Sequence, residues 1–103
     1  MVTQQDALWG ELNAQTARIS WKELERHFAR GVLVWVAPDL DLVEVAVSVV
    51  RDDKRAIYMH MDCGKLVQLT DEQAGDWATR EAELWAVVAA PWVLVQERGA
   101  TPA

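Results

Sequence analysis

The sequence predicts an α+β fold, a single small domain in which four to five helices pack on a small sheet. A chain of 103 residues with 51% hydrophobic and 25% charged residues has the length and composition of one globular domain. Short apolar runs near 32–37, 65–69 and 92–96 are typical of buried strands, and capping signals between them indicate helices. We expect the domain to span residues 1–97 and a flexible polar tail to follow at 98–103.

The stretch 84–96 is the most apolar part of the chain, with eleven apolar residues of thirteen. Its β-branched and aromatic runs favour strand pieces over a helix. Pro91 cannot donate a ladder hydrogen bond, so we expect it at a bulge or at the start of the second piece. Residues 92–96 are then a strand with both faces covered, and 32–37 is its natural partner.

Six tryptophans are unusual for a chain of this length. Most of them are expected to fill core volume. Trp35 and Trp92 lie in apolar strand runs without a polar break, so we predict that both are core residues.

The first part of the chain contains two helix signals. A T-x-x-D motif at Thr3 resembles a capping box and precedes leucines at helical spacing, which predicts a helix over 4–17. An S-x-x-E motif at Ser20 predicts a second helix over 21–30, and Gly31 is well placed to end it.

Residues 42–50, LVEVAVSVV, fit two structures. Valines that alternate at period two indicate a strand. However, Asp41 and Glu44 stand where the N-cap and the third residue of a helix belong, and the segment also has an apolar helical face.

Residues 56–61 are ambiguous in the same way. They could pair with 65–69 in a hairpin, or form a short helix that Asp52 caps and Gly64 ends. Thr70, with glutamine three residues later, predicts a capped helix in the following segment.

Several of these segments together resemble a known family. LDLVEVAV at 40–47, the acidic pair at 52–53, DEQAGDW at 71–77 and PWVLVQE at 91–97 are similar to a family of small bacterial proteins known only as a domain of unknown function. The resemblance runs from Trp9 to Glu97. It implies helices at 41–50 and 52–63 followed by a strand at 65–69. The family gives no activity, cofactor or catalytic residue that could be transferred to this chain.

The net charge of −6 argues against a general nucleic-acid binder, which needs a basic face, and against docking on anionic lipid. No run approaches the roughly 18 apolar residues of a membrane span. The N-terminus lacks the features of a signal peptide, and the single Cys63 excludes an intrachain disulfide. We therefore expect a cytoplasmic protein that makes no contact with a membrane.

No motif indicates catalysis. His60 and Cys63 are three residues apart, but two ligands are fewer than zinc needs. The chain contains no phosphate-binding glycine loop and no nucleophile motif. We expect no catalytic, cofactor-binding or metal-binding residue, and a dispensable Cys63.

The content of large apolar side chains favours a non-catalytic protein-interaction or regulatory module with an unknown protein partner. Tryptophan is enriched at interfaces, and methionine suits adaptable binding surfaces. The candidate interaction surface comprises Trp9, Tyr58, Met59, Met61 and Trp85. The alternative is a winged-helix-like nucleic-acid-associated regulator, in which 53–62 would be the recognition helix.

Apolar surface also exceeds what helices of so short a chain can cover. This excess predicts a homodimer through a patch near the sheet or through the segment of Met59 and Met61. As the last strand, 92–96 is expected to form an exposed edge.

Overall fold

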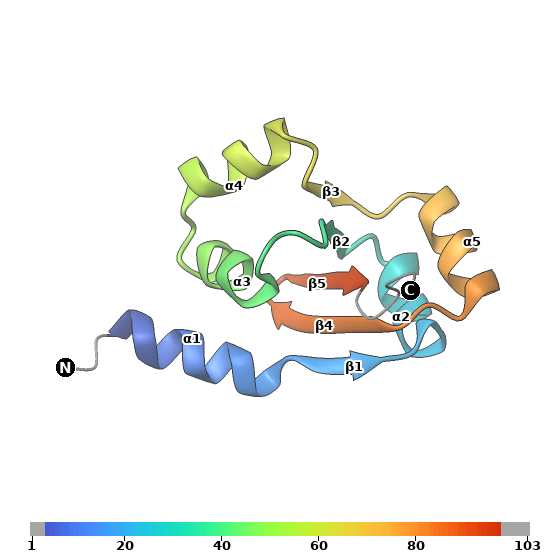
Figure 1. The fold of residues 1–103 in the computed structure, drawn as a ribbon, viewed down its shortest axis with the longest axis horizontal. Helices are drawn as coiled ribbons and strands as arrows, with labels where there is room; N and C mark the ends of the chain where they lie inside the picture. Colours follow the sequence, from blue (N-terminus) through green and yellow to red (C-terminus); the bar gives the residue numbers. More distant parts are fainter. Residues whose placement is uncertain (1–3, 98–103) are drawn as a thin grey trace.

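A computed structural model describes the chain from residue 4 to residue 97, with side chains from residue 7. The described part contains five helices and five strands (Figure 1). The helices are α1 (Gln4–Gln15), α2 (Trp21–Ala29), α3 (Leu42–Val50), α4 (Lys54–Asp62) and α5 (Asp71–Arg80). The strands are β1 (Ala17–Ile19), β2 (Leu33–Val36), β3 (Leu66–Gln68), β4 (Leu84–Ala89) and β5 (Trp92–Glu97).

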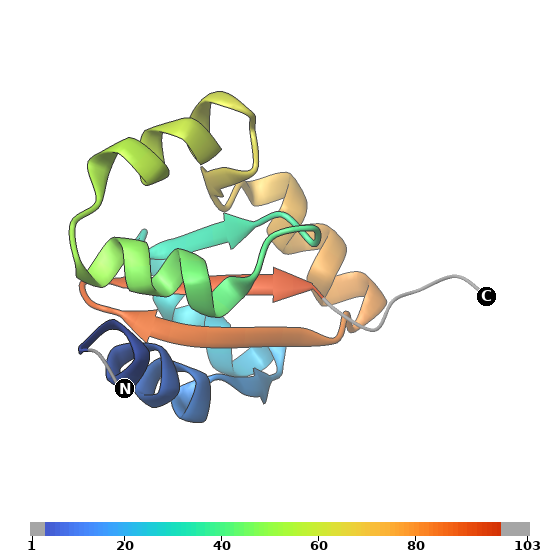
Figure 2. The same cartoon turned by 60° about the vertical axis from the view of Figure 1, so that its left-hand side comes forward.

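The strands form one mixed sheet in the order β1-β4-β5-β2-β3. Strands β2 and β5 are parallel, and the other neighbours are antiparallel. Helices α1, α3 and α4 lie on one face of the sheet, whereas α2 and α5 cover the other (Figures 1 and 2). The predicted α+β class is confirmed, and the sheet is larger than the three predicted strands.

The predicted pairing of 32–37 with 92–96 is confirmed, but the prediction that the last strand is an edge is wrong. Strand β5 lies between β4 and β2. The apolar stretch folds back on itself as a hairpin in which Ala89 pairs with Trp92, and the cis Ala90–Pro91 bond forms the turn. Pro91 is tolerated there because a turn requires no ladder hydrogen bond from it. The edges are β1 and β3, of three residues each.

The prediction that Trp92 is a core residue is also wrong, because its side chain is 38% exposed. As the first residue after the hairpin turn, it lies at the end of the sheet, where helices cover it incompletely. Trp35 is half-buried against the cluster under α2 and α5. Trp77 of α5 is the tryptophan with a buried side chain in the described part of the chain.

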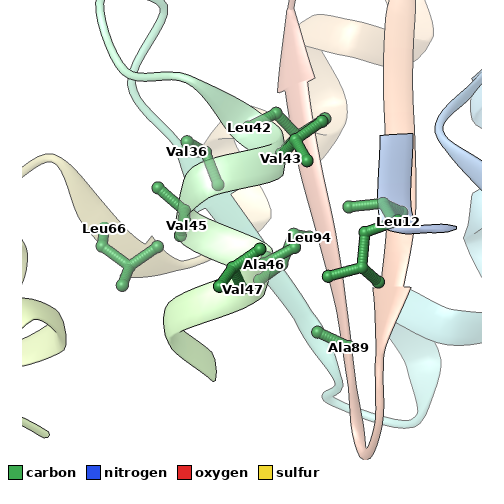
Figure 3. Packing of buried hydrophobic residues seen from close by; sticks show 11 residues of the cluster. Leu12, Val36, Leu42, Val43, Val45, Ala46, Val47, Leu66, Ala89 and Leu94 are labelled. Carbon is green, nitrogen blue, oxygen red and sulfur yellow. The ribbon is translucent and has the colours of Figure 1, made fainter. Parts of the chain in front are cut away.

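Segment 42–50 is helical, as the family resemblance implied. The Asp41 carboxylate accepts hydrogen bonds from the backbone N–H groups of Val43 (2.9 Å) and Glu44 (3.3 Å). Of the alternating valines, Val43, Val45 and Val47 are buried as α3 packs against the sheet and α1 (Figure 3), and Val49 is half-buried. Burial in the tertiary structure thus overrides the weak strand preference of valine.

The helix ends mostly follow the capping signals. Thr70 and Gln73 form the predicted capping box, with both bonds at 3.1 Å. Asp53 caps α4 in place of the predicted Asp52. Helix α1 ends at Gln15, because the next residues form β1 rather than a last helical turn. The predicted cap at position 3 and the tail at 98–103 lie outside the described residues.

A cluster of charged side chains joins α5 to the end of β5. The buried indole of Trp77 donates to Glu97 Oε1 at 3.1 Å. Arg80 donates to both Glu97 oxygens (2.9 and 3.0 Å) and to Asp76. Hydrogen bonds from Arg80 lower the pKa of both carboxyl groups. This cluster fixes α5 on its face of the sheet.

We predict that Glu97→Ala lowers the free energy of unfolding by about 1–3 kcal/mol, because it leaves the buried indole N–H without an acceptor. Glu97→Gln keeps an acceptor oxygen and should cost less. Urea unfolding at neutral pH measures both changes. Glu83→Ala, which removes only the exposed pair with Arg18, is the control and should cost less than about 1 kcal/mol. Equal losses in the Ala and Gln variants would contradict this role.

The same cluster predicts that the free energy of unfolding depends on pH. Because the pKa values of Asp76 and Glu97 are lowered by folding, their contribution is present at neutral pH and is lost as the pH falls through the folded-state values. Urea midpoints measured from neutral pH down to about pH 3 should fall less steeply for Glu97→Gln than for the parent chain. Identical slopes would show that Glu97 contributes nothing.

Glu81 ends α5 in the left-handed conformation, with φ 52° and ψ 50°. Because this conformation strains a residue that has a Cβ atom, Glu81→Gly should stabilise the protein by about 0.5–1 kcal/mol. The control is Ala78→Gly within α5, which should destabilise by a similar amount. Thermal melts should show a higher midpoint for Glu81→Gly and a lower midpoint for Ala78→Gly than for the parent chain.

Candidate functional site

An apolar groove of about 280 Å³ opens between α4 and the part of the sheet formed by β2, β3 and β5. Eight of the nine residues that line it have apolar side chains, and the ninth is glutamine. They are Val34, Val49, Ile57, Met61, Leu66, Val67, Gln68, Trp92 and Leu94. The groove therefore brings together residues of β2, α3, α4, β3 and β5.

The position of α4 creates this groove. The helix contains no buried residue, and it contacts mainly α3 and β3 (Figure 2). At its start, the Asp53 carboxylate accepts from Ala56 N–H at 3.2 Å. At its end, the backbone N–H of Lys65 donates to the carbonyl of His60 at 2.9 Å, and Gly64 adopts φ 72°. Helix α4 is thus secured at its ends, and its middle forms one wall of the groove.

Within α4, Ile57 and Met61 line the groove, and they lie four residues apart on one side of the helix. The side chain of Ile57 is half-buried, whereas that of Met61 is 50% exposed. Tyr58 and Met59 do not line the groove and are 59% and 56% exposed. The helix therefore has apolar side chains both toward the groove and toward solvent.

The five residues of the predicted interaction surface do not form one patch. Tyr58, Met59 and Met61 lie together on α4. Trp9 lies on α1 and is 39% exposed, and Trp85 of β4 is half-buried against the core. Trp9 and Trp85 therefore stand apart from the groove.

Sequence reasoning missed most of the groove. Trp92 and Leu94 are two residues apart in β5 and point to the same face of the sheet, so strand alternation could have linked them. Ile57 and Met61 at helical spacing could have been linked similarly. No sequence signal connects the two pairs, because only the folded chain brings β5 near α4.

A second, polar cleft lies between α1 and α3, with a volume of about 400 Å³. Trp9 lines it beside charged groups of both signs, including Glu44, Arg51 and Asp53. Two carboxylates and one guanidinium give the lining a net charge of −1, which disfavours an anion.

The groove offers no group for acid–base or nucleophilic chemistry, because none of its lining residues is titratable. Shifted pKa values occur instead in exposed ion pairs; for example, Lys65 at 2.6 Å lowers the pKa of Asp39. His60 is half-buried and Cys63 is exposed at the end of α4. Between residues 4 and 97, the structure brings no three His, Cys, Asp or Glu residues together as a metal site.

No described helix is long and apolar enough to span a membrane.

The chain is similar over its full length to PA1075 from Pseudomonas aeruginosa, known from an NMR solution structure. The two share 43% sequence identity with a TM-score of 0.81, and the match covers 97% of PA1075. No curated protein matches the chain. A family model described as a protein of unknown function, DUF2288, matches residues 7–97, and the chain therefore belongs to this family.

Proposed function

We propose that this protein is a non-catalytic protein-interaction module that binds an apolar segment of a partner protein in the groove beside α4. The observation that carries the proposal is the open groove, whose lining is apolar except for Gln68. Met61 lies at its mouth, and the flexible thioether of methionine adapts to varied partner side chains. Trp92 supplies a large, partly exposed aromatic surface of the kind that anchors protein interfaces.

The electrostatics favour a protein over a nucleic acid as the partner. The chain carries a net charge of −6, and a nucleic-acid binder needs basic residues that displace counterions from phosphates. The absence of a titratable side chain in the groove favours binding over catalysis. We assign the module to the cytosol, where a free thiol such as Cys63 stays reduced.

The shape of the site favours an amphipathic helix as the bound segment. The strand at its border, β3, has only three residues, which is too short to template an added strand. A helix instead inserts side chains spaced three and four residues apart into an apolar groove. We therefore assign the groove to a helix whose large apolar anchors contact Met61 and Trp92.

We predict that a displayed library of amphipathic helical peptides, selected on the parent protein, yields binders that Met61→Asp weakens about tenfold or more, since the charge would lie in an apolar contact. The control is Met59→Asp on the same helix, which lies outside the groove and should leave binding unchanged. Titration calorimetry of selected peptides measures both. Peptides that bind the two variants equally well would reject the groove as the site.

A further inference from the structure

The outward face of α4 carries a second apolar feature that the groove does not use. Arg55, Tyr58, Met59 and Asp62 follow one another at i, i+3, i+4 and i+7, which is the spacing of one helix face. All four side chains are exposed. The half-buried residues of the helix, Ala56, Ile57 and His60, lie on the opposite side. We name these four exposed residues the α4 stripe.

The α4 stripe is complementary to itself. Its midpoint falls between Tyr58 and Met59, with Arg55 three residues before the first and Asp62 three residues after the second. A two-fold axis through this midpoint would place an identical helix antiparallel to α4. Arg55 of each copy would then lie opposite Asp62 of the other, and Tyr58 opposite Met59.

We propose that α4 is a self-association face, on which a second copy of this chain packs antiparallel through the α4 stripe. In this arrangement two apolar Tyr–Met contacts form the centre, and an ion pair closes each end. An aromatic ring and a methionine sulfur attract one another, and the buried centre of an interface is where such side chains contribute most. This is a second binding face, distinct from the groove of the proposed function.

Charge supports a second copy as the occupant. Within the described part of the chain, neither Arg55 nor Asp62 forms an ion pair, so both charges are available to a partner. Two copies of a chain with a net charge of −6 repel one another, so they approach best through a segment that is not acidic. Residues 51–65 carry four basic and three acidic side chains, and the excess of acid lies elsewhere.

Charge reversal tests this geometry. Size exclusion coupled to light scattering should give the parent chain a mass of twice 11.6 kDa. Arg55→Asp and Asp62→Arg each place like charges at both ends of the interface, so each variant alone should be a monomer or dissociate about tenfold more readily. An equimolar mixture of the two variants should form a heterodimer, because both end pairs are then of opposite sign.

Combining both substitutions in one chain should likewise restore the homodimer. Met61→Asp, which alters the groove, is the control and should remain dimeric. A parent chain with the mass of one copy at all concentrations would overturn the proposal. Variants that stay dimeric alone, or a mixture that stays monomeric, would overturn it equally.

The outcome is separable from that of the proposed function. Peptide binding depends on Met61 in the groove, whereas dimer formation depends on Arg55 and Asp62 in the α4 stripe. Circular dichroism of each variant tests whether it is folded, and neither substitution should disturb the fold because Arg55 and Asp62 are both exposed. Loss of the dimer with retained peptide binding would therefore reject only the self-association face.

Discussion

The structure depends on strand β5, which pairs with β4 along one side and β2 along the other. Residues 93–96 are buried because helices cover both faces of this strand. Its one buried polar side chain, Gln96, donates from Nε2 to the carbonyls of Ala37 and Leu40, both at 2.8 Å. The last strand thus also holds the loop that leads into α3.

This central strand explains why the groove exists. Helix α3 supplies most of the apolar surface that covers its face of the sheet, and α1 adds Leu12 beside it. The chain must then travel from the end of α3 to β3 at the sheet edge. Helix α4 makes this connection, and nine helical residues span about 13 Å. Because α4 crosses beside the sheet without burying a side chain, Trp92 stays partly exposed beneath it, and the buried Leu94 lines the groove next to it.

Local signals predicted the helices well, whereas pairing in the sheet depended on distant residues. Asp41 and Thr70 cap helices because their side chains reach N–H groups two or three residues away. Strand β1 has three residues, too few to show a period, and forms only by pairing with β4. For the candidate site, the sequence indicated Tyr58, Met59 and Met61 of α4, because aromatic and methionine side chains are typical of interfaces. It could not indicate Trp92, since the hairpin turn that exposes this residue also makes β5 central.

The two faces of α4 share one physical constraint. An isolated helix of nine residues is marginal in water, and α4 gains little from burial because none of its residues is buried. Its order therefore comes from the Asp53 cap, from the contact with α3 and from the attachment to β3. A helix held in this way presents apolar side chains toward the groove, where Ile57 also packs against the core, and toward solvent, where Tyr58 and Met59 are exposed. Substitutions at Met61 can then act apart from substitutions at Tyr58 and Met59, which is the physical basis for proposing two binding faces on one short helix.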